Sequence, residues 1–493
     1  MRSHFVALLL LMAAPAAAED IPRFEQRGQA TQLIVDGEPF LILGGELGNS
    51  EASSRAAMRA HWPKLQAMNL NTVLVPVYWE LVEPEEGRFD FASVDWLLAD
   101  ARAHDMRLAL LWFGTWKNSM SSYVPSWVKR DTRRFPRTTG ADGRPQEIIS
   151  AHSAEARDAD ARAFAALMRH LRQVDGDDRT VIMVQVETEV GFLPFAKEGG
   201  NGTDLAADER ATATAYARFV EAVAAAGKAE YPLPLFVNGA QNRPGVAPGD
   251  YPSGGPLAHL AHEWREGAPS IDFIAPDIYF PSFAGIVDGY VEAGARPLFI
   301  PEANRPADPT LVANALRSIG ARDAIGFSPF AIGGADKAQA ARIGGLYAML
   351  GSIAPLVLAA QAEGRIAGFG NPIAFDGTAD LAPLTAELGD ARFTVTTVDP
   401  WTPREAQDPK GHGGLLIRLG GEDYLFAGTG VTLTVEPADG RGRLGFDRVE
   451  EGRYENGEWL PGRRLNGDQT HQGRHVRLPP GGFAVQRFRL YRY

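Results

Sequence analysis

The sequence predicts an α/β fold class: a (β/α)8 TIM barrel followed by a small C-terminal domain that resembles a β-sandwich. Eight short apolar runs alternate with segments of helical spacing, and eight parallel strands close such a barrel. After about Ala360 the pattern changes to glycine-rich turns between alternating or β-branched runs, which is typical of antiparallel sheets. The length of 493 residues suits a barrel of roughly 250 residues or more with one appended domain.

The eight expected strands each lead into polar or aromatic residues at their C-terminal ends. They cover residues 40–46, 72–79, 107–112, 181–189, 233–238, 272–279, 297–302 and 324–330. Amphipathic helical spacing occupies residues 56–68, 93–104, 154–173, 209–226 and 337–351. An open doubly wound sheet is the alternative, but such a sheet normally has a glycine-rich phosphate loop after its first strand, and this sequence has none there.

The second domain is expected to consist of short antiparallel strands. Alternating or β-branched runs occupy residues 393–398, 414–419, 424–427 and 431–435. We place the domain boundary near residue 365, which assigns residues 19–365 to the barrel and residues 366–493 to the β-rich domain.

The composition argues against several functional classes. The formal net charge is −12, so no broad basic surface is expected for a nucleic acid or for anionic lipid heads. The chain has no cysteine, which removes disulfides, thiolate catalysis and cysteine-based metal sites. The histidines at His259 and His262 lack the residue order of a zinc protease, and no metal is expected. A neutral or weakly charged substrate is therefore favoured.

The first 18 residues resemble a signal peptide, covering residues 1–18. A basic start at Arg2 precedes an apolar stretch at residues 5–12, and the small residues 16–18 form a cleavage site. The stretch is too short to span a bilayer, and no later run of about 18 apolar residues is expected to do so. We therefore predict a periplasmic or extracellular protein without membrane insertion, with a buried N-terminal helix as the alternative.

Carboxylates at strand ends are the candidate catalytic groups, because the active site of a barrel lies at the C-terminal ends of its strands. Glu46, Glu189 and Glu302 hold such positions. In the fourth strand, a period of two places Gln185, Glu187 and Glu189 on one face. Two carboxylates on a buried strand are costly unless they are paired, hydrogen-bonded or used in chemistry. Hydrolysis of a glycosidic bond needs two carboxyl groups, and the fourth and seventh strands supply a pair.

Aromatic residues gather at or just after the same strand ends, as expected for a pocket that stacks sugar rings. They are Trp79, Trp112, Trp116, Tyr123, Trp127, Tyr279 and Phe280. Each of them alone could equally pack in the core, and a single glutamate at a strand end is more often solvated or ion-paired than catalytic.

The stretch from Trp62 to Trp112, with its loop Glu-Pro-x-x-Gly-x-Phe-Asp-Phe, resembles glycoside hydrolase family 35, the β-galactosidases. The resemblance extends over about residues 30–350, and the final domain is similar to the β-domain of a bacterial subgroup. The family's strand-four motif Glu-Asn-Glu corresponds here to Glu-Thr-Glu, which implies that Glu189 is the acid/base. The resemblance also implies that Glu302 is the nucleophile.

The same resemblance assigns sugar-binding positions. Tyr279 matches the position that contacts the nucleophile, and Glu46 lies where sugar-binding groups gather. The sequence departs from the family pattern at two places in the pocket. Thr188 replaces the asparagine that bonds the 2-hydroxyl group of the sugar, and residues 110–128 lack the family's galactose-contacting Asn-Ala-Glu triplet. We expect a pocket rebuilt around Trp112, Trp116, Lys117 and Asn118. The expected substrate-binding residues are Glu46, Tyr78, Trp112, Trp116, Asn118, Glu187, Thr188, Asn238 and Tyr279.

The implied activity is that of a retaining, exo-acting β-galactosidase, which hydrolyses terminal non-reducing β-D-galactosyl residues of an oligosaccharide or polysaccharide by double displacement. No metal or organic cofactor is expected. The nearest alternative is another β-glycosidase of the same clan with a different sugar. A carbohydrate-binding protein that has lost turnover is a further alternative, although both carboxylates are present. A structural envelope protein has only the export signal in its favour.

Overall fold

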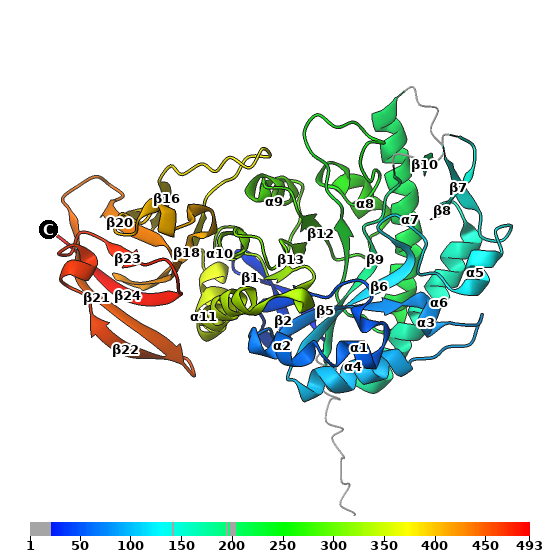
Figure 1. Ribbon diagram of the computed structural model, residues 1–493, viewed down its shortest axis with the longest axis horizontal. Coiled ribbons are helices and arrows are strands. Elements are labelled where there is room, and N and C mark those ends of the chain that lie inside the picture. Colours follow the sequence, from blue (N-terminus) through cyan, green and yellow to red (C-terminus); the bar gives the residue numbers. More distant parts are fainter. Residues whose placement is uncertain (1–20, 141, 194–195, 198–203) are drawn as a thin grey trace, which may run out of the picture.

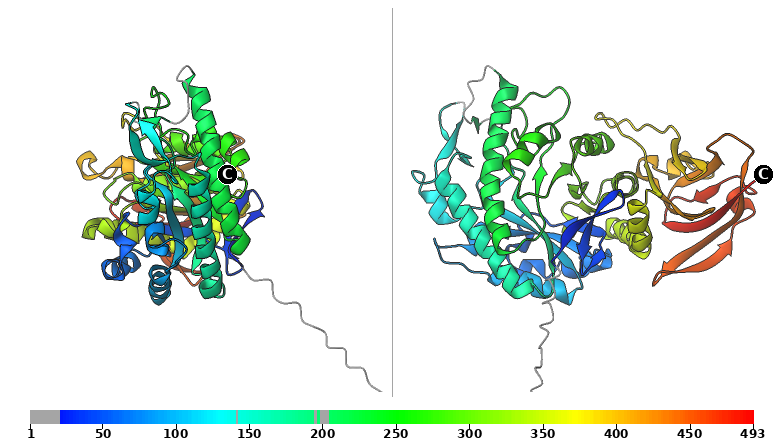
Figure 2. Two further views of the ribbon diagram at one scale, coloured as in Figure 1. Left: turned by 90° about the vertical axis from the view of Figure 1, so that its right-hand side faces the viewer. Right: turned by 180° about the vertical axis from the view of Figure 1, so that it is seen from behind.

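The computed structural model describes residues 21–140, 142–193, 196–197 and 204–493. The expected signal peptide, residues 1–18, lies outside these residues. Two bodies lie side by side in Figure 1 and in the right-hand view of Figure 2, a helix-covered barrel and a β-rich C-terminal domain.

Eight parallel strands form a closed barrel, which confirms the predicted fold class. They are β4 (Ile42–Glu46), β5 (Thr72–Tyr78), β6 (Arg107–Lys117), β9 (Val181–Thr188), β11 (Leu235–Gly239), β12 (Phe273–Ile278), β13 (Ile300–Ala303) and β14 (Gly326–Pro329). The closed order is β11-β12-β13-β14-β4-β5-β6-β9, so each strand pairs with its neighbour in this series. Nearly all strand residues are buried because helices cover the outer face and side chains fill the interior.

Helices follow the strands around the outside of the barrel (Figure 1). They are α1 (Arg55–Met58), α2 (Trp62–Ala67), α3 (Trp79–Val82), α4 (Ala92–Ala103), α5 (Ser126–Arg130), α6 (Ala154–Asp175), α7 (Leu205–Glu230), α8 (Ala261–Gly267), α9 (Phe283–Glu292), α10 (Leu311–Ala321) and α11 (Lys337–Ala362). The single helix expected at residues 56–68 is divided into α1 and α2. Pro63 lies in the first turn of α2, where its missing N–H costs nothing, whereas inside a continuous helix it would remove a hydrogen bond.

A short antiparallel sheet closes the N-terminal end of the barrel. It consists of β1 (Arg23–Arg27), β2 (Ala30–Val35) and β3 (Glu38–Pro39). The ring of Phe24 packs edge-on against Phe273, the first residue of β12, with a centroid distance of 5.4 Å. This end of the barrel is therefore covered, and the opposite end is the one available to a substrate.

Helix α11 contradicts the expectation that no later segment is apolar enough to span a membrane. By length and composition it qualifies, with a mean hydropathy of 1.8 in its most apolar window. However, 56% of that window is buried inside the protein, and Tyr347 donates hydrogen bonds to the carbonyls of Gly44 and Phe327. These contacts are those of a core helix, whose apolar surface packs against the barrel and the C-terminal domain.

The C-terminal domain contains two antiparallel sheets. The larger has the order β15 (Ile366–Gly370), β18 (Gly413–Gly420), β19 (Asp423–Thr429), β24 (Ala484–Arg492), β21 (Leu444–Glu455) and β22 (Glu458–Arg464). The smaller has the order β16 (Leu384–Leu388), β17 (Ala391–Thr396), β20 (Val431–Pro437) and β23 (Val476–Leu478). Phe393, Leu433 and Phe488 belong to one hydrophobic core shared by both sheets, as in a β-sandwich.

A third small sheet extends the strand-three and strand-four region of the barrel mouth. It consists of β10 (Ala196–Lys197), β7 (Arg137–Gly140) and β8 (Pro145–Ile149), all antiparallel.

The two domains meet where α10 packs against β15 and β18. A Cβ atom added to Gly320 of α10 would lie 2.6 Å from the Cα atom of Gly368 and 2.4 Å from a methyl group of Leu415. Helix and strand can therefore approach this closely only because Gly320 has no side chain.

We predict that Gly320→Ala destabilises the protein by about 1–3 kcal/mol, because the added methyl group overpacks the domain interface. Gly289→Ala is the matched control, since Gly289 also lies in a helix and its added Cβ would meet no atom within 4 Å. Chemical denaturation of both variants measures the difference. Equal stability of the two variants would show that the α10–β15 contact is not tight in solution.

Candidate active site

Four carboxyl groups converge at the C-terminal end of the barrel. Glu46 ends β4, Glu189 follows β9, Asp277 lies in β12 and Glu302 lies in β13. One oxygen each of Glu189, Asp277 and Glu302 lies within 4.8 Å of the others. Glu46, Asp277 and Glu302 are buried, whereas the side chain of Glu189 is 14% exposed. The structure thus brings together the three glutamates predicted from the strand ends.

Glu302 is oriented by a tyrosine. The hydroxyl group of Tyr279 donates a short hydrogen bond to Oε1 of Glu302. Burial, and then the charge of Glu302, raise the pKa of Tyr279, so that this hydroxyl group keeps its proton. The structure thus contains the contact between Tyr279 and Glu302 that the sequence predicts.

Glu46 and Glu302 form a carboxyl pair. Burial, followed by the charge of Glu302, raises the pKa of Glu46 well above its ordinary value. A protonated Glu46 donates a hydrogen bond to Glu302, while Glu302 also accepts the bond from Tyr279. We therefore place the shared proton on Glu46.

Lys117 supplies the cation of this acidic site. Its Nζ atom lies 3.1 Å from Oε2 of Glu189, and the residue is only 4% exposed. Burial lowers the pKa of Lys117, but the surrounding carboxylates, above all Glu189 and Glu302, raise it by a larger amount. The pKa of Lys117 is therefore raised overall. The ammonium group also lies 5.4 Å from the ring centroid of Phe113. Lys117 therefore stays charged at neutral pH.

Asn238 connects Glu189 with Asp277. Its Oδ1 atom accepts a hydrogen bond of 3.0 Å from the backbone N–H of Glu189, and its Nδ2 donates one of 2.5 Å to Oδ2 of Asp277. Burial, and then the charge of Glu302, raise the pKa of Asp277. Sequence reasoning missed Asp277, although its place two residues before Tyr279 puts both residues on one face of the strand.

Glu187 does not share a face with Glu189, so this part of the prediction is wrong. Both residues have left-handed backbone conformations, with φ of 63° and 47°, and these conformations break the alternation of a strand. The carboxylate of Glu187 accepts hydrogen bonds from the backbone N–H groups of Thr115 (3.1 Å) and Trp116 (2.7 Å). Glu187 is thus used to hold the backbone of β6 and is not available to a substrate.

Asp160 of α6 completes this buried network. Its carboxylate accepts hydrogen bonds from Nε1 of Trp112 (2.8 Å) and from the N–H (2.8 Å) and hydroxyl (2.6 Å) groups of Thr115. Burial, and then the neighbouring Asp160, raise the pKa of Glu187 well above its ordinary value, so that the Glu187 carboxyl group keeps its proton. The network lies where the β6–β9 register shifts between Trp112 and Lys117. It therefore shapes the bulge from which Lys117 enters the site.

The two tryptophans expected to bind sugar lie outside the barrel wall, which corrects the prediction for both. Trp112 packs against Phe164 of α6 and donates its indole hydrogen bond to Asp160. Trp116 donates to the carbonyl of Ile149 and packs against Phe219 of α7. Both side chains are fully buried, because the bulge in β6 turns them toward the helices.

Three other predicted residues have distinct environments. Tyr78 is buried and donates a hydrogen bond of 2.7 Å to the carbonyl of Asn49. Thr188 is fully buried, and its hydroxyl oxygen accepts a hydrogen bond of 2.9 Å from Gln185. Asn118 is exposed at the end of β6, where its backbone N–H donates to the carbonyl of Thr188. Of these three, only Asn118 presents its side chain to solvent.

The acidic cluster also has the spacing that a divalent cation could chelate, through Glu189, Asp277 and Glu302. Lys117 already neutralises Glu189, and the pKa of Asp277 is raised by burial first, so these ligands are poorly suited to a metal.

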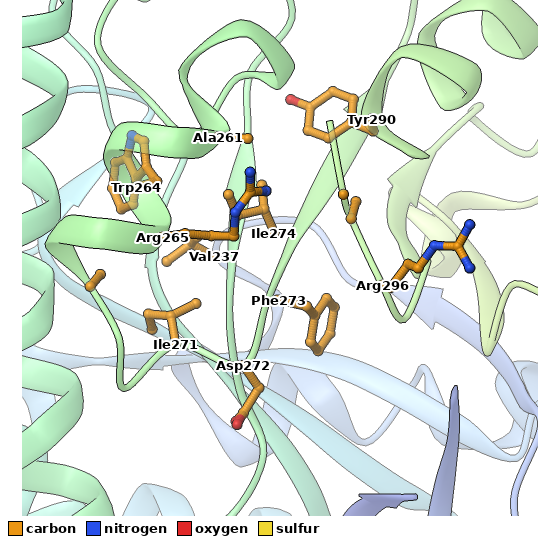
Figure 3. A pocket seen from close by; sticks show the side chains of 13 residues that line it. Val237, Ala261, Trp264, Arg265, Ile271, Asp272, Phe273, Ile274, Tyr290 and Arg296 are labelled. Atoms are coloured by element: carbon orange, nitrogen blue, oxygen red, sulfur yellow. The ribbon is translucent and has the colours of Figure 1, made fainter. Parts of the chain in front are cut away.

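A separate cavity of about 110 Å3 lies between α8, α9 and β12 (Figure 3). Its lining includes Trp264, Phe273 and Tyr290, together with Arg265 and Asp272. None of the four converging carboxyl groups reaches it, and it contains no cluster of reactive side chains. We regard it as a gap in helix–sheet packing.

Known proteins resemble this chain in two separate regions. The β-galactosidase model of glycoside hydrolase family 42 matches residues 49–196, and a domain of unknown function, DUF5597, matches residues 343–477. The barrel is β-galactosidase-like. The matched region contains β6, β9 and Glu189, whereas DUF5597 begins within α11 and includes most of the C-terminal domain.

Curated relatives support the same relation over short stretches. A β-galactosidase of Xanthomonas manihotis is 40% identical over 91 residues, and the human β-galactosidase-1-like protein 3 is 35% identical over 109 residues. These matches cover 18% and 21% of this chain, but only 15% and 16% of the relatives. The predicted relation to β-galactosidases is confirmed, while the choice of family 35 stays a prediction beside the family 42 match.

A solved structure shares the barrel fold, and a second solved structure is also similar. The family 42 β-galactosidase Gan42B of G. stearothermophilus has a TM-score of 0.50 at 15% identity, covering 68% of this chain and 59% of its own. A β-galactosidase from Rahnella sp. R3 has a TM-score of 0.49 at 15% identity, covering 68% and 57%.

We predict that Glu187→Gln makes stability less dependent on pH. A carboxyl group whose pKa is raised on folding stabilises the protein below its ordinary pKa, and this contribution is lost as the pH rises through the folded-state value. The wild type should therefore lose more unfolding free energy than the variant as the pH rises above the ordinary pKa of a glutamate, 4.5. The amide nitrogen can still donate to Asp160, but the amide has one acceptor oxygen for the two backbone N–H groups of Thr115 and Trp116. The variant should therefore also be less stable than the wild type by a similar amount at every pH.

Urea denaturation across this pH range measures the effect. Glu85→Gln is the control, because the side chain of Glu85 is 67% exposed and pairs with Arg88 at the surface. Parallel stability curves for Glu187→Gln and the wild type would contradict a raised pKa of Glu187 in the folded protein.

Proposed function

We propose that this protein is a retaining, exo-acting β-galactosidase that removes terminal non-reducing β-D-galactosyl residues from oligosaccharides or polysaccharides. The observation that carries the proposal is the separation of Glu189 and Glu302, whose nearest carboxylate oxygens lie within 4.8 Å. Retaining glycosidases hold their two carboxyl groups about 5–5.5 Å apart, whereas inverting enzymes leave about 6.5–9.5 Å for a water molecule. The separation of the pair falls short of the range of inverting enzymes, and it therefore favours covalent catalysis.

Glu302 is suited to the role of nucleophile. Tyr279 fixes its Oε1 atom, and among the described residues no N–H group and no serine, threonine or tyrosine hydroxyl group donates to the buried Oε2 atom. An oxygen without such a donor keeps its electron density for attack on the anomeric carbon. The proton held by Glu46 prevents a further negative charge beside it.

Glu189 is suited to the role of acid/base. Its Oε2 atom bonds to Lys117, which leaves Oε1 to carry the proton that the leaving oxygen receives. In the first step the negative charge moves from Glu302, which becomes an ester, to Glu189, which becomes a carboxylate. Lys117 contacts Glu189 directly and therefore stabilises the charge where it arrives. Water then enters, loses its proton to Glu189 and releases the sugar.

A related β-glycosidase with another sugar is the second candidate. Thr188 stands where the resembled family has the asparagine that bonds the 2-hydroxyl, and it is fully buried with Gln185 as its donor. Trp112 and Trp116 also lie outside the pocket. These differences concern the choice of sugar and leave the carboxylate pair intact. Export, predicted from residues 1–18, belongs to the proposal for either sugar.

Release of nitrophenol from β-linked nitrophenyl sugars tests the proposed activity. We expect the wild type to prefer galactose over glucose, xylose, fucose, mannose and galacturonic acid, and Glu302→Gln to lose turnover on every sugar. Glu189→Gln should lose about 10²–10⁴-fold on substrates whose leaving group needs a proton, and much less on dinitrophenyl galactoside.

Azide provides the control for the two roles. With Glu189→Ala, azide should restore turnover and give a β-galactosyl azide, because the small anion can attack the intermediate without a general base. Preference for another sugar would keep the mechanism and change the specificity. A folded wild type that binds oligosaccharides but turns over none of these sugars would favour the alternative of a carbohydrate-binding protein.

We predict that Lys117→Met moves the acid limb of the kcat/KM profile to higher pH by about one unit. Lys117 lowers the pKa of Glu302 against the larger effect of burial, so its removal raises that pKa and the nucleophile ionises later. Lys129→Met is the control, because Lys129 pairs with Glu80 and is 33% exposed. A Lys117→Met profile with an unchanged acid limb would contradict the electrostatic role of Lys117.

A further inference from the structure

A hairpin of the C-terminal domain reaches back to the barrel. Residues 371–383 connect β15 with β16 and extend from the C-terminal domain toward the barrel above α9 (Figure 1). Phe375 lies near the tip of this hairpin and is 38% exposed. Its ring contacts that of Phe280, with a centroid distance of 6.0 Å. The hairpin therefore touches the segment that follows β12.

The tip of the hairpin is held by its own hydrogen bonds. The backbone N–H of Ala374 donates to the carbonyl of Thr378 (2.9 Å), and the N–H of Gly377 donates to the carbonyl of Ala374 (2.9 Å). Gly377 has a φ of +85°, which glycine adopts without strain. Lys410 then anchors the turn through a hydrogen bond of 2.9 Å to the carbonyl of Gly377. These bonds preorganise the position of Phe375.

Phe280 places this contact next to the catalytic carboxylates. It directly follows Tyr279, whose hydroxyl group bonds to Glu302 and whose side chain is 43% exposed. On the other side of Tyr279, Phe330 packs edge-on at a centroid distance of 6.1 Å. Aromatic rings from β12, from the end of β14 and from the C-terminal domain thus line one side of the barrel mouth.

The exposed aromatic rings at the barrel mouth can pack against a ligand that has an apolar face and polar groups at its edges. Aromatic rings that cluster at the mouth of a pocket are typical of a binding site, and the C–H face of a pyranose ring packs against such rings. The catalytic carboxylates account for the sugar that is cleaved. The aromatic rings at the barrel mouth are then available to bind the leaving group of the substrate.

We propose that Phe375, together with Phe280 and Tyr279, forms the subsite that binds the leaving sugar, so that the C-terminal domain completes the active site. This inference rests on the proposed glycosidase function. The pyranose ring on the reducing side of the scissile bond would lie on the Phe375–Phe280 surface. The appended domain would then contribute to the choice of the chain from which the sugar is released.

The test compares Phe375→Ala with the wild type on two substrates of the sugar selected by the nitrophenyl panel. One is a disaccharide, and the other is the glycosyl fluoride, whose leaving group has no ring. We expect Phe375→Ala to lower kcat/KM for the disaccharide about 3- to 10-fold and to leave the fluoride unchanged, while Phe375→Trp keeps both. Tyr491→Ala is the control, since Tyr491 is an exposed aromatic residue of the same domain near the chain end marked C in Figure 1.

An equal loss on both substrates, or no loss on either, would overturn the inference. Binding to Glu302→Gln separates this failure from failure of the proposed function. Calorimetry should show that adding Phe375→Ala weakens binding of the disaccharide but not of the monosaccharide. If the wild type turns over neither substrate, the proposed function fails, and the same calorimetric comparison still decides whether Phe375 binds the second sugar.

Discussion

The contact between Lys117 and Glu189 is the interaction on which the rest of the site depends. Four carboxyl groups lie together in a nearly dry barrel mouth, and ionised carboxylates at such a place repel one another strongly. Two features relieve this repulsion: the buried ammonium group of Lys117, and the protons kept on Glu46 and Asp277, whose pKa values burial raises. The catalytic carboxylates can therefore stand close to each other without separating the strands that carry them.

Lys117 reaches the site only because β6 is bulged between Trp112 and Lys117. The pair formed by Asp160 and Glu187 builds this bulge by accepting hydrogen bonds from the indole of Trp112 and the backbone at Thr115 and Trp116. A Cβ atom at Gly114 would lie 2.6 Å from Oε1 of Glu187 and 2.7 Å from Oδ2 of Asp160, so the bulge also requires glycine. The pair of Asp160 and Glu187 thus stabilises the backbone that positions Lys117 beside the catalytic carboxyl groups.

The parts of the structure that the sequence predicts are those set by local pattern. Strand ends follow from the run of apolar residues, and they correctly bring Glu46, Glu189 and Glu302 together. The face of the strand on which a side chain lies depends on the backbone conformation. The left-handed conformations at Glu187 and Glu189 change that face, and the alternation of apolar and polar residues in the sequence does not reveal this change. The β6 bulge similarly turns Trp112 and Trp116 outward. The contact between Phe280 and Phe375 joins two domains, which no local pattern can indicate.

The position of Lys117 also bears on the charge balance between the two catalytic carboxylates. Glycosylation removes the charge of Glu302 and creates one on Glu189, so the net charge of the site is the same before and after the step. A unit charge pair at about 4 Å is worth about 4 kcal/mol at an effective dielectric constant of about 20. An ammonium group near only one carboxylate would favour one side of the step by an energy of this order. Lys117 interacts with both Glu189 and Glu302, and this shared interaction keeps the two states closer in energy than a fixed pair with either residue alone.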